Sequence, residues 1–455
     1  MDKGRLIARY EQRLPRYTSY PTAPHFGPSV DAATYAAWLA ALPAHEAISL
    51  YLHVPFCRTL CRFCGCHTTA VNNPATLASY AGLLRTEIGL LARVIGRRLR
   101  VSHIHWGGGT PTSLAGADMI AISAALRQHF DIDAATEIAV EIDPRVLTAD
   151  RLDALAAIGI TRASLGVQDF DPSVQQAIGR EQSFAATAEA AAALRAIGVG
   201  SLNLDLLYGL PYQSEAGLDA TVRAALSLQP DRLAVFGYAH VPWMQRHQAL
   251  IPEAALPDTI ARFHQRELAE RLIAEAGYTP IGLDHFARAE DSMAVAARVG
   301  ALRRNFQGYT TDQATTLIGL GASAIGALPQ GYAQNAARVP AYRAALAKGQ
   351  LPIARGVALD ADDRLRRAAI ERVMCDLALD LPALIAAHDA APDALDDAHP
   401  ALDALAADGL IAWDGEHLAV TPAARPFLRV IAACFDRYLP RAASNPVPAR
   451  HALTI

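Results

Sequence analysis

The segment Pro-Phe-Cys-Arg-Thr-Leu-Cys-Arg-Phe-Cys-Gly-Cys, residues 55–66, carries Cys57, Cys61 and Cys64 within eight residues. Gaps of three and then two residues are too tight for a disulfide framework, and three thiols are one ligand short of a closed tetrahedral zinc site. The spacing favours a cubane iron–sulfur cluster in which thiolates hold three irons and the fourth iron is open. An open iron binds and activates a small molecule, so the segment predicts redox or radical chemistry.

Zinc coordination and inert burial are the alternatives for these cysteines. Structural zinc sites usually combine two separated ligand pairs, and the remaining cysteines, Cys66, Cys375 and Cys434, form no second pair. Inert core thiols are the second alternative, and this is the interpretation we give to Cys375 and Cys434, because both lie in apolar helical stretches. A ferredoxin site is disfavoured, since the run does not end in Cys-Pro.

Composition limits the class of protein. The 455 residues, 52% of them hydrophobic, predict one large domain with one or two smaller ones. Lys and Arg number 41 against 45 Asp and Glu, a net charge of −4, so nothing indicates a nucleic-acid or membrane partner. Six cysteines, a charged N-terminus and no apolar run of ~20 residues predict a reducing, cytoplasmic location. No heptad seam is present, so we expect a monomer.

Short apolar runs alternate with amphipathic stretches rich in Ala and Leu. The runs that predict strands are 48–54, 101–106, 137–142, 162–168, 201–208 and 232–238. The stretches that predict helices include 77–94, 118–129, 184–197 and 217–228. This alternation is typical of a parallel sheet with helical crossovers.

Six strand–helix units are fewer than the eight of a closed barrel. We therefore predict an α/β fold, a partly open (β/α)6 TIM-like barrel over residues 46–340, with a doubly wound sheet as the alternative. Residues 1–45 form a predicted N-terminal arm, turn-rich over 15–24. Residues 341–455 form a predicted, mostly helical C-terminal domain, in which Asp414-Gly415 marks a hairpin of winged-helix type.

Polar and small residues follow the predicted strands, at the edge where such barrels place their active sites. The cysteine loop follows the first strand and the glycine run 107–109 the second; the later strands are followed or ended by Glu141, Asp143, Gln168, Asp205 and Ala239. A glycine run lets a ligand approach the backbone. Glu141 and Asp205 suit ribose hydroxyls or an amino group, and Arg180 suits a carboxylate. Tyr51 and Phe63 suit an adenine or a sulfonium ion.

Beyond the cysteines, several longer segments carry a family resemblance. They are Pro-Arg-Tyr-Thr-Ser-Tyr-Pro-Thr-Ala (15–23), Cys-Gly-Cys (64–66), His-Trp-Gly-Gly-Gly-Thr-Pro-Thr (105–112), Ser-Leu-Gly-Val-Gln-Asp (164–169), Asp-Leu-Leu-Tyr-Gly-Leu-Pro (205–211), Gly-Leu-Asp-His-Phe-Ala (282–287), Arg-Asn-Phe-Gln-Gly-Tyr-Thr-Thr (304–311) and Cys-Phe-Asp (434–436). Over its whole length the chain resembles the oxygen-independent coproporphyrinogen III oxidases of the radical S-adenosylmethionine (SAM) superfamily.

The resemblance implies the cofactors and their residues. A [4Fe-4S] cluster would be held by Cys57, Cys61 and Cys64, and two SAM molecules would bind, one on the open iron and one beside it. The residues implied for the first SAM are Tyr51, Gly108, Glu141 and Ile325. Those implied for the second are Phe63, Gly109, Thr110, Gln168, Arg180, Asp205 and Ala239. Tyr51 and Cys66 are the implied catalytic residues, and Cys66 is not expected to bind the cluster.

The resemblance also implies the reaction. The substrate would be coproporphyrinogen III, with two propionates oxidatively decarboxylated to vinyl groups in haem biosynthesis, and the electron donor and acceptor stay unidentified. Such a tetra-anion needs cations, for which the candidates are Arg16, Arg288, Arg303 and Arg304. Tyr17 and Tyr20 of the arm would either cover the flat tetrapyrrole or pack in the core.

Two alternative functions belong to the same superfamily. A haem chaperone would share the barrel, but such relatives typically lack the Cys-Gly-Cys ending and the Pro-Arg-Tyr-Thr-Ser-Tyr-Pro arm, which this chain has. A radical SAM methyltransferase would use the second SAM as a methyl donor, and the resemblance over the C-terminal domain argues against it.

Overall fold

The structure is a computed structural model that describes residues 3–439. It is built around one sheet of 12 strands in the order β16-β15-β14-β13-β1-β4-β5-β6-β7-β8-β10-β9. Its strands are β1 (Ile48–Val54), β4 (Val101–Gly108), β5 (Glu137–Ile142), β6 (Arg162–Gln168), β7 (Ser201–Tyr208), β8 (Arg232–Gly237), β9 (Thr279–Ile281), β10 (His285–Ala287), β13 (Thr316–Leu320), β14 (Ile325–Leu328), β15 (Gly331–Asn335) and β16 (Ile353–Ala358). Neighbours from β13 to β8 run parallel, and the flanking strands are antiparallel.

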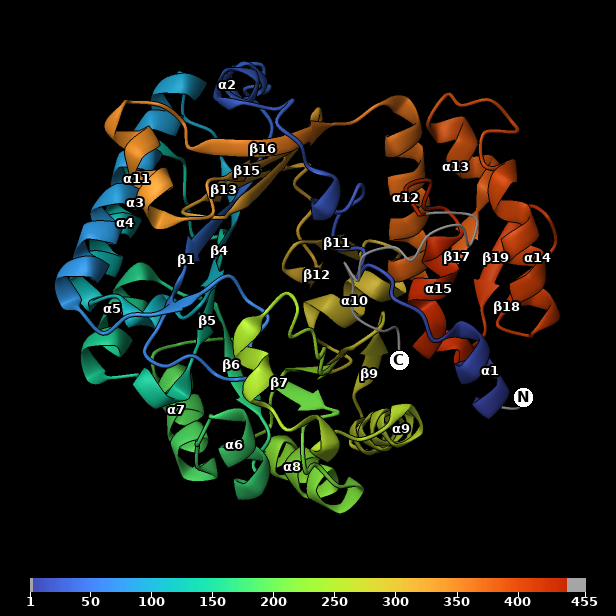
Figure 1. The fold of residues 1–455 in the computed structure, drawn as a ribbon. Helices are drawn as coiled ribbons and strands as arrows, with labels where there is room; N and C mark the ends of the chain where they lie inside the picture. The colour runs from blue at the N-terminus through green and yellow to red at the C-terminus, as the bar shows by residue number, and fades with distance from the viewer. Residues whose placement is uncertain (1–2, 440–455) are drawn as a thin grey trace.

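Helices cover the convex side of this curved sheet (Figure 1). The helices up to the end of the barrel are α1 (Lys3–Tyr10), α2 (Ala32–Ala40), α3 (Pro74–Ile95), α4 (Gly116–His129), α5 (Ala149–Ile158), α6 (Pro172–Ile178), α7 (Phe184–Ala196), α8 (Glu215–Ser227), α9 (Thr259–Glu275), α10 (Ser292–Arg298) and α11 (Val339–Ala347). The six predicted strands and the four predicted helices are confirmed, most of them to within one or two residues. The fold is therefore the predicted, partly open TIM-like barrel.

One parallel strand was not predicted from the sequence. β13 pairs in parallel with β1 on the side away from β4, with Ile48 opposite Thr316. No helical crossover precedes it; the hairpin of β11 (Arg303–Asn305) and β12 (Gly308–Thr310) does. Because the expected strand–helix alternation is missing there, a buried run of only five residues gave no distinct signal.

The N-terminal segment packs in two different places. Leu6, Tyr10, Tyr17 and Tyr20 belong to one apolar cluster with the C-terminal helices, whereas Tyr35 in α2 belongs to the core of the barrel. Figure 1 accordingly shows α1 beside the last helix of the chain. The domain boundaries after residues 45 and 340 stay predictions; the described contacts tie the two ends of the chain together.

The C-terminal segment is mostly helical and contains a small three-stranded sheet. Its elements are α12 (Ala361–Asp376), β17 (Ala378–Asp380), α13 (Leu381–Ala387), α14 (His399–Ala407), β18 (Ile411–Trp413), β19 (His417–Val420) and α15 (Leu428–Ala433). β18 and β19 form an antiparallel hairpin around Asp414-Gly415, and β17 pairs with β19 as a third strand. Gly415 has a φ of 98°, which explains a glycine in this turn. Within residues 3–439, no helix is long and apolar enough to span a membrane.

A buried carboxylate locks the end of the sheet beyond β13. Glu87 of α3 is 1% exposed and accepts hydrogen bonds from Gly321 N (2.7 Å), Asn335 Nδ2 (2.7 Å) and Tyr342 Oη (2.5 Å). These donors come from the β13–β14 turn, β15 and α11. One side chain of α3 thus holds three later elements together.

A Glu87→Gln variant should lose a pH dependence of stability that the wild type shows. Burial raises the pKa of Glu87 from 4.5 to about 7, although its three hydrogen bonds lower it. The folded state therefore binds the proton more tightly than the unfolded chain, so stability falls as pH rises towards the folded pKa. Between pH 6 and 8 the wild type should lose about 1 kcal/mol of unfolding free energy from this group.

Denaturant unfolding at both pH values measures this loss, with exposed Glu181→Gln as the control. An equal fall in Glu87→Gln would show that the group does not titrate in this way.

Candidate active site

The four cysteines of residues 55–66, which are the three predicted cluster ligands and Cys66, line one cavity of about 690 Å³ at the carboxyl end of β1. β2 (Phe56–Cys57) pairs in parallel with β3 (Thr69–Ala70), so the loop between them leaves and rejoins the barrel at one place. Arg62 N donates to Ile178 O (2.8 Å), which fastens the loop to α6. Within the described residues, no three side chains of His, Cys, Asp or Glu lie close enough together to hold one metal ion. The thiols instead share the wall of one cavity, a donor set that fits a cluster with one thiolate per iron.

Hydrogen-bond donors and positive charges surround these thiols. Cys57 Sγ lies 3.2 Å from Thr68 Oγ1 and 3.5 Å from Thr110 Oγ1. Arg145 Nη2 and Arg180 Nη1 each donate to Cys61 Sγ at 3.6 Å. The positive charges favour thiolates, the form that binds iron.

Cys64 is the thiol whose pKa is lowered. A hydrogen bond from the Cys66 side chain, opposed by burial and aided by the Cys66 N–H and the Arg180 charge, lowers the pKa of Cys64 to about 7. Cys66 itself is exposed, and its backbone N–H lies 3.4 Å from Cys64 Sγ.

The glycine run lies directly against the cysteine loop. Gly109 N donates to Val54 O at 2.8 Å. A Cβ on Gly108, whose φ is 112°, would lie 2.6 Å from the His53 ring, and one on Gly109 would lie 2.7 Å from Phe56 O. Glycine is thus required here for close approach of β4 to β1 and its loop, in addition to the access for a ligand predicted from the sequence.

Two partly buried carboxylates face the same cavity, and their pKa values are shifted in opposite directions. Glu141 accepts from Gly108 N and pairs with His105 Nε2, both at 3.0 Å; these contacts outweigh burial and lower the pKa of Glu141. Asp205 accepts from Ser164 Oγ (2.8 Å) and Asn203 Nδ2 (2.7 Å). Burial, and next the Glu141 charge, raise the pKa of Asp205 to about 6. Both groups are acceptors at neutral pH, which suits hydroxyl and amino donors.

Most of the predicted cofactor-binding residues line this cavity. Those in its wall are Phe63, Gly108, Gly109, Thr110, Glu141, Gln168, Arg180 and Asp205, together with Cys66. Gln168 has a φ of 71°, an unusual conformation for a residue with a side chain and one that is common at functional sites.

Three predicted residues lie outside this wall. Tyr51 lies behind it, with its hydroxyl 3.0 Å from His53 Nδ1. Ala239 lines a separate cleft beyond β8, and Ile325 begins β14. The contacts predicted for these residues stay predictions.

Arg145 was not among the predicted site residues, and Asp143 was predicted only to lie at the active-site edge, without a role. Asp143 Oδ2 holds Arg145 Nη2 at 2.7 Å and Arg180 Nη1 at 3.4 Å, so one carboxylate positions both guanidinium groups over Cys61. Arg145, and next Arg180, lower the pKa of Asp143 against the effect of burial. The signal was present in the sequence, because Asp143-Pro-Arg145 directly follows the third predicted strand.

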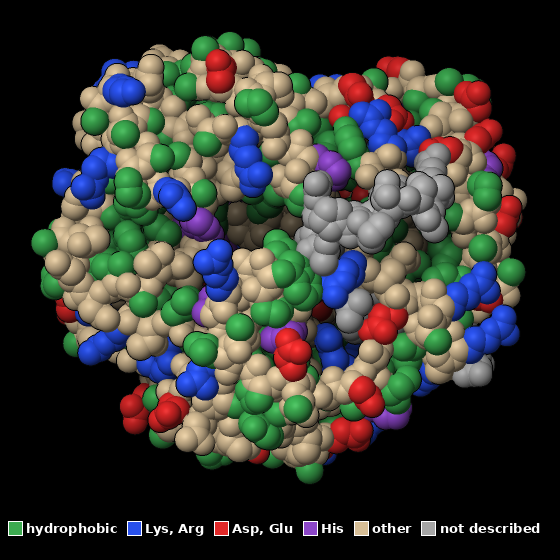
Figure 2. All heavy atoms as spheres, in the orientation of Figure 1, with side chains coloured by type: hydrophobic (Ala, Val, Ile, Leu, Met, Phe, Trp, Pro, Cys, Tyr) green, Lys and Arg blue, Asp and Glu red, His purple; other side chains and the backbone are tan. Residues whose placement is uncertain are grey.

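The cysteine cavity adjoins the interior of the barrel. A cavity of about 980 Å³ fills that interior and shares Glu141, Ser164 and Asp205 with the first. Imidazole–carboxylate pairs recur around it, in His103–Asp312 (3.0 Å) and in the His105–Glu141 pair. Figure 2 shows the molecule hollowed near the centre of this face, with Lys and Arg side chains on the rim.

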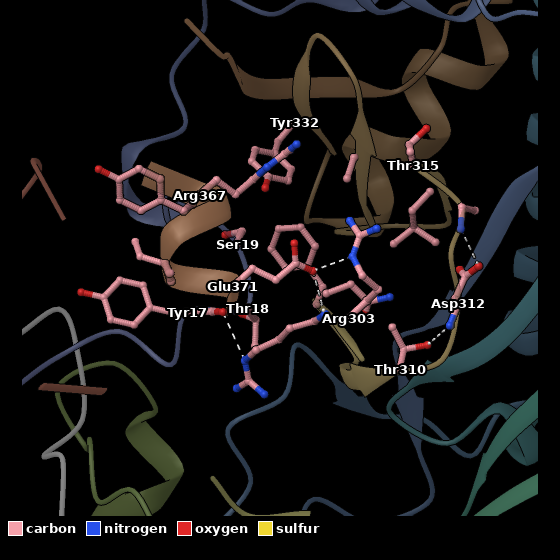
Figure 3. A pocket seen from close by; sticks show the side chains of 18 residues that line it. Tyr17, Thr18, Ser19, Arg303, Thr310, Asp312, Thr315, Tyr332, Arg367 and Glu371 are labelled. Carbon is pink, nitrogen blue, oxygen red and sulfur yellow. Dashed lines mark hydrogen bonds and ion pairs between the residues drawn. The ribbon is translucent and has the colours of Figure 1, made fainter. Parts of the chain in front are cut away.

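A third cavity, of about 860 Å³, lies between the arm, the β11–β12 hairpin and α12 (Figure 3). Arg303 Nε pairs with Glu371 Oε1 at 2.8 Å, so its charge is compensated. Arg304 donates to Arg16 O (3.0 Å) and Tyr17 O (3.2 Å) and stands over the Tyr309 ring. Of the predicted cations, these two are therefore engaged within the protein.

Two predictions remain, that of Arg288 as a cation for the substrate and that of Tyr17 and Tyr20 in the arm. Arg288 stands over Tyr278 and donates to Pro230 O at 3.0 Å. Tyr17 and Tyr20 are 4% and 1% exposed and pack in the core, so of the two interpretations offered for them, core packing holds.

Comparison with known proteins places the chain among relatives that match nearly all of it. The family model of the Radical SAM superfamily matches residues 51–225, and that of the HemN C-terminal domain matches residues 359–427. The oxygen-independent coproporphyrinogen III oxidase of Bradyrhizobium diazoefficiens is 53% identical over 429 residues, covering 94% of this chain and 95% of the relative. That of Escherichia coli is 39% identical over 439 residues, covering 95% of each.

A solved structure gives the same relationship in three dimensions. The coproporphyrinogen III oxidase HemN of Escherichia coli, described as a radical SAM enzyme, matches with a TM-score of 0.89 at 38% identity. The match covers 94% of this chain and 100% of that one. It includes the N-terminal and C-terminal segments as well as the barrel.

Proposed function

From the premise that the chain belongs to the oxygen-independent coproporphyrinogen III oxidase family, we propose that it converts coproporphyrinogen III to protoporphyrinogen IX. In this reaction two propionates each lose a hydrogen atom, carbon dioxide and one electron, and become vinyl groups. The chain is a radical SAM oxidoreductase of haem biosynthesis with a [4Fe-4S] cluster and SAM. The observation that carries the proposal is the cavity, lined by Cys57, Cys61 and Cys64, that adjoins the hollow barrel.

We assign the cluster to Cys57, Cys61 and Cys64. Arg145 and Arg180, aligned by Asp143, stabilise the negative charge on Cys61, and the threonine hydroxyls do the same for Cys57. When bound, the cluster and SAM supply the one-electron chemistry that removes the hydrogen atom. The protein orients the reactants and excludes water.

We propose roles for Glu141, Tyr51 and Cys66 from the residues that surround them. Glu141, ionised, accepts hydrogen bonds from the SAM on the cluster, beside Gly108 and Ile325. Burial, and next the Glu141 charge, raise the pKa of Tyr51 well above its usual range, so its hydroxyl keeps its proton and orients His53. Cys66, exposed beside Cys64, does not bind the cluster and is, with Tyr51, one of the two proposed catalytic residues.

A second SAM completes the proposed site. Its residues are Phe63, Gly109, Thr110, Gln168, Arg180, Asp205 and Ala239. All but Ala239 lie in the wall of the cysteine cavity, and Asp205 also faces the barrel interior, which supports a position between cluster and substrate. We further propose one-electron carriers as donor and acceptor, a monomeric state, a cytoplasmic location, and neither nucleic acid nor membrane as partner.

Anaerobic turnover tests the function. Protein reconstituted with iron and sulfide, reduced and given SAM and coproporphyrinogen III, should form one 5′-deoxyadenosine for each vinyl group, read by mass spectrometry. SAM cleavage with an intact tetrapyrrole would remove the oxidase assignment. Tight haem binding without turnover would indicate a chaperone, and a methylated product a methyltransferase.

A further inference from the structure

A separate cleft of about 770 Å³ opens beyond the carboxyl end of β8, beside Gly237 and Tyr238. Five arginines line it, and we call it the arginine cleft. They are Arg13 and Arg16 from the arm, Arg262 and Arg266 from α9, and Arg429 from α15. A single carboxylate, that of Asp284, lines it with them, and His240 is the remaining titratable side chain apart from Tyr208 and Tyr238. In a chain of net charge −4, such a concentration of positive charge indicates an anion site.

The depth of the cleft contains guanidinium nitrogens that lack an acceptor among the described residues. Arg266 is 7% exposed; its Nη2 pairs with Glu270 at 2.5 Å, but its buried Nη1 has no hydrogen-bond partner there. Arg262 donates from Nη2 to Tyr238 O at 2.9 Å, while its buried Nε has no partner either. No ion pair joins Arg262 to a carboxylate among the described residues, so its charge can attract an anion bound in the cleft through space.

The one carboxylate of the cleft is already engaged. Asp284 pairs with His285 Nδ1 at 2.7 Å. That contact, followed by the charges of Arg304 and Arg16, outweighs burial and lowers the pKa of Asp284 to about 2. Burial, and next the Arg16 charge, lower the pKa of Arg429 to about 9, so Arg429 is still a cation at neutral pH. Asp284, already paired with His285, therefore offsets little of the positive charge that the five arginines bring to the cleft, although Glu270 compensates Arg266.

The cleft is one layer of side chains away from the barrel interior. Phe236 and His285 line the interior. The guanidinium of Arg16 stands 5.7 Å from the Phe236 ring centroid, and Asp284 reaches from the cleft to His285. A macrocycle in the barrel that extends past the end of β8 would bring its peripheral carboxylates to Arg16.

The arginines around the other two cavities offer much less charge. In the barrel interior, Arg162 pairs with Glu137 at 3.1 Å and Arg232 with Asp291 at 2.8 Å. The cavity of Figure 3 is lined by three arginines, Arg303, Arg304 and Arg367, together with the carboxylates of Glu371 and Asp312. Of these three cavities, the arginine cleft has the largest excess of arginines over carboxylates in its wall.

We propose that the arginine cleft binds those propionate carboxylates of the tetrapyrrole that are not reacting, and thereby directs a reacting propionate towards the cysteine cavity. This inference rests on the proposed function and names the part of the site that holds the charged substrate. The arginines act as specificity-determining residues for a polycarboxylate; the hydrogen-abstracting chemistry does not involve them.

The test compares two arginines of one helix. Arg262→Gln removes a cleft guanidinium, whereas Arg271→Gln removes an exposed one that pairs with Glu275 at 3.1 Å. Coproporphyrin III, a tetracarboxylate, is titrated into the cluster-loaded protein under anaerobic conditions and followed by fluorescence quenching. Arg262→Gln should raise Kd about tenfold or more, since a charge-assisted hydrogen bond is lost, and Arg271→Gln should not change it.

Three further measurements make the result specific. The uncharged tetramethyl ester of coproporphyrin III should bind the wild type and Arg262→Gln equally. KM for coproporphyrinogen III should rise in the variant, while its iron content stays that of the wild type. Arg16→Gln repeats the comparison at an exposed arginine of the cleft, so that the result does not depend on the partly buried Arg262 alone. Circular dichroism checks that each variant is folded.

The outcomes separate this inference from the function beneath it. If both cleft variants bind coproporphyrin III as tightly as a wild type that forms vinyl product, the cleft assignment is wrong and the function stands. If the wild type neither binds nor converts the tetrapyrrole, both are wrong. If citrate raises Tm only when the cleft arginines are present, and coproporphyrin III does not compete with it, the cleft holds a free small anion and the inference is overturned.

Discussion

Replacing Cys61 by alanine should remove the iron–sulfur cluster and, with it, all conversion of coproporphyrinogen III. Cys57, Cys61 and Cys64 are the three proposed ligands in the cavity wall, so loss of one leaves two for a cluster that needs three. Cys61 is also the thiol that receives hydrogen bonds from Arg145 and Arg180, and both guanidinium groups would lose that partner. Iron analysis and the absorbance of the reconstituted protein measure cluster content, and release of 5′-deoxyadenosine measures activity.

Two other cysteines serve as controls for this result. Cys375→Ala changes a buried thiol of α12, outside the cavity wall, and should keep full iron content and activity. Cys66→Ser changes the exposed thiol beside Cys64 and should keep the cluster while product formation falls. Loss of iron from Cys66→Ser, or an intact cluster in Cys61→Ala, would contradict the assignment of ligands.

Replacing Glu141 by glutamine should lower kcat/KM for SAM cleavage by about a hundredfold or more, with the cluster intact. One Glu141 oxygen pairs with His105 and the other accepts from Gly108 N, and an amide has a single oxygen for these two partners. Each charge-assisted hydrogen bond lost costs about 1.5–3 kcal/mol, and tenfold in rate corresponds to ~1.4 kcal/mol. The initial rate of 5′-deoxyadenosine release and the iron content are the two measurements.

Glu189→Gln, an exposed change on α7, is the control and should leave both quantities unaltered. A Glu141→Gln protein with wild-type kcat/KM would show that this carboxylate does not hold the nucleotide cofactor. A Glu141→Gln protein without iron would instead show that the substitution disturbs the cysteine loop. The glycine run beside Glu141 lies against the start of that loop through the hydrogen bond from Gly109 N to Val54 O.

Much of the barrel follows from local pattern. The six predicted strands are apolar runs separated by long amphipathic stretches, and β6 shows the expected alternation of buried and partly exposed residues. β13 was missed because its neighbour in space, β1, lies more than 250 residues earlier in the chain. Local pattern also could not decide whether Tyr17 and Tyr20 cover a ligand or pack in the core, because contacts with the C-terminal segment bury them.

The candidate site divides in the same way. Cys57, Cys61 and Cys64, the glycine run and the strand-end carboxylates are close in sequence to strands or to one another, and most of these residues do line one cavity. Arg145 was overlooked as a site residue because its importance lies in a contact with Cys61, 84 residues earlier in the chain. Its place after the third predicted strand was a signal in the sequence, but only the fold shows that contact.

The order of residues along the chain alone determined the parallel barrel and the family and predicted the ligand set, because ligand spacing and hydrophobic periodicity are properties of neighbouring residues. Tertiary structure alone decided which charges meet. The arginine cleft takes its guanidinium groups from the arm, α9 and α15, which are separated by more than 150 residues at each step. Electrostatic attraction depends on distance through space, so an anion site assembled from three distant segments exists only once the chain has folded.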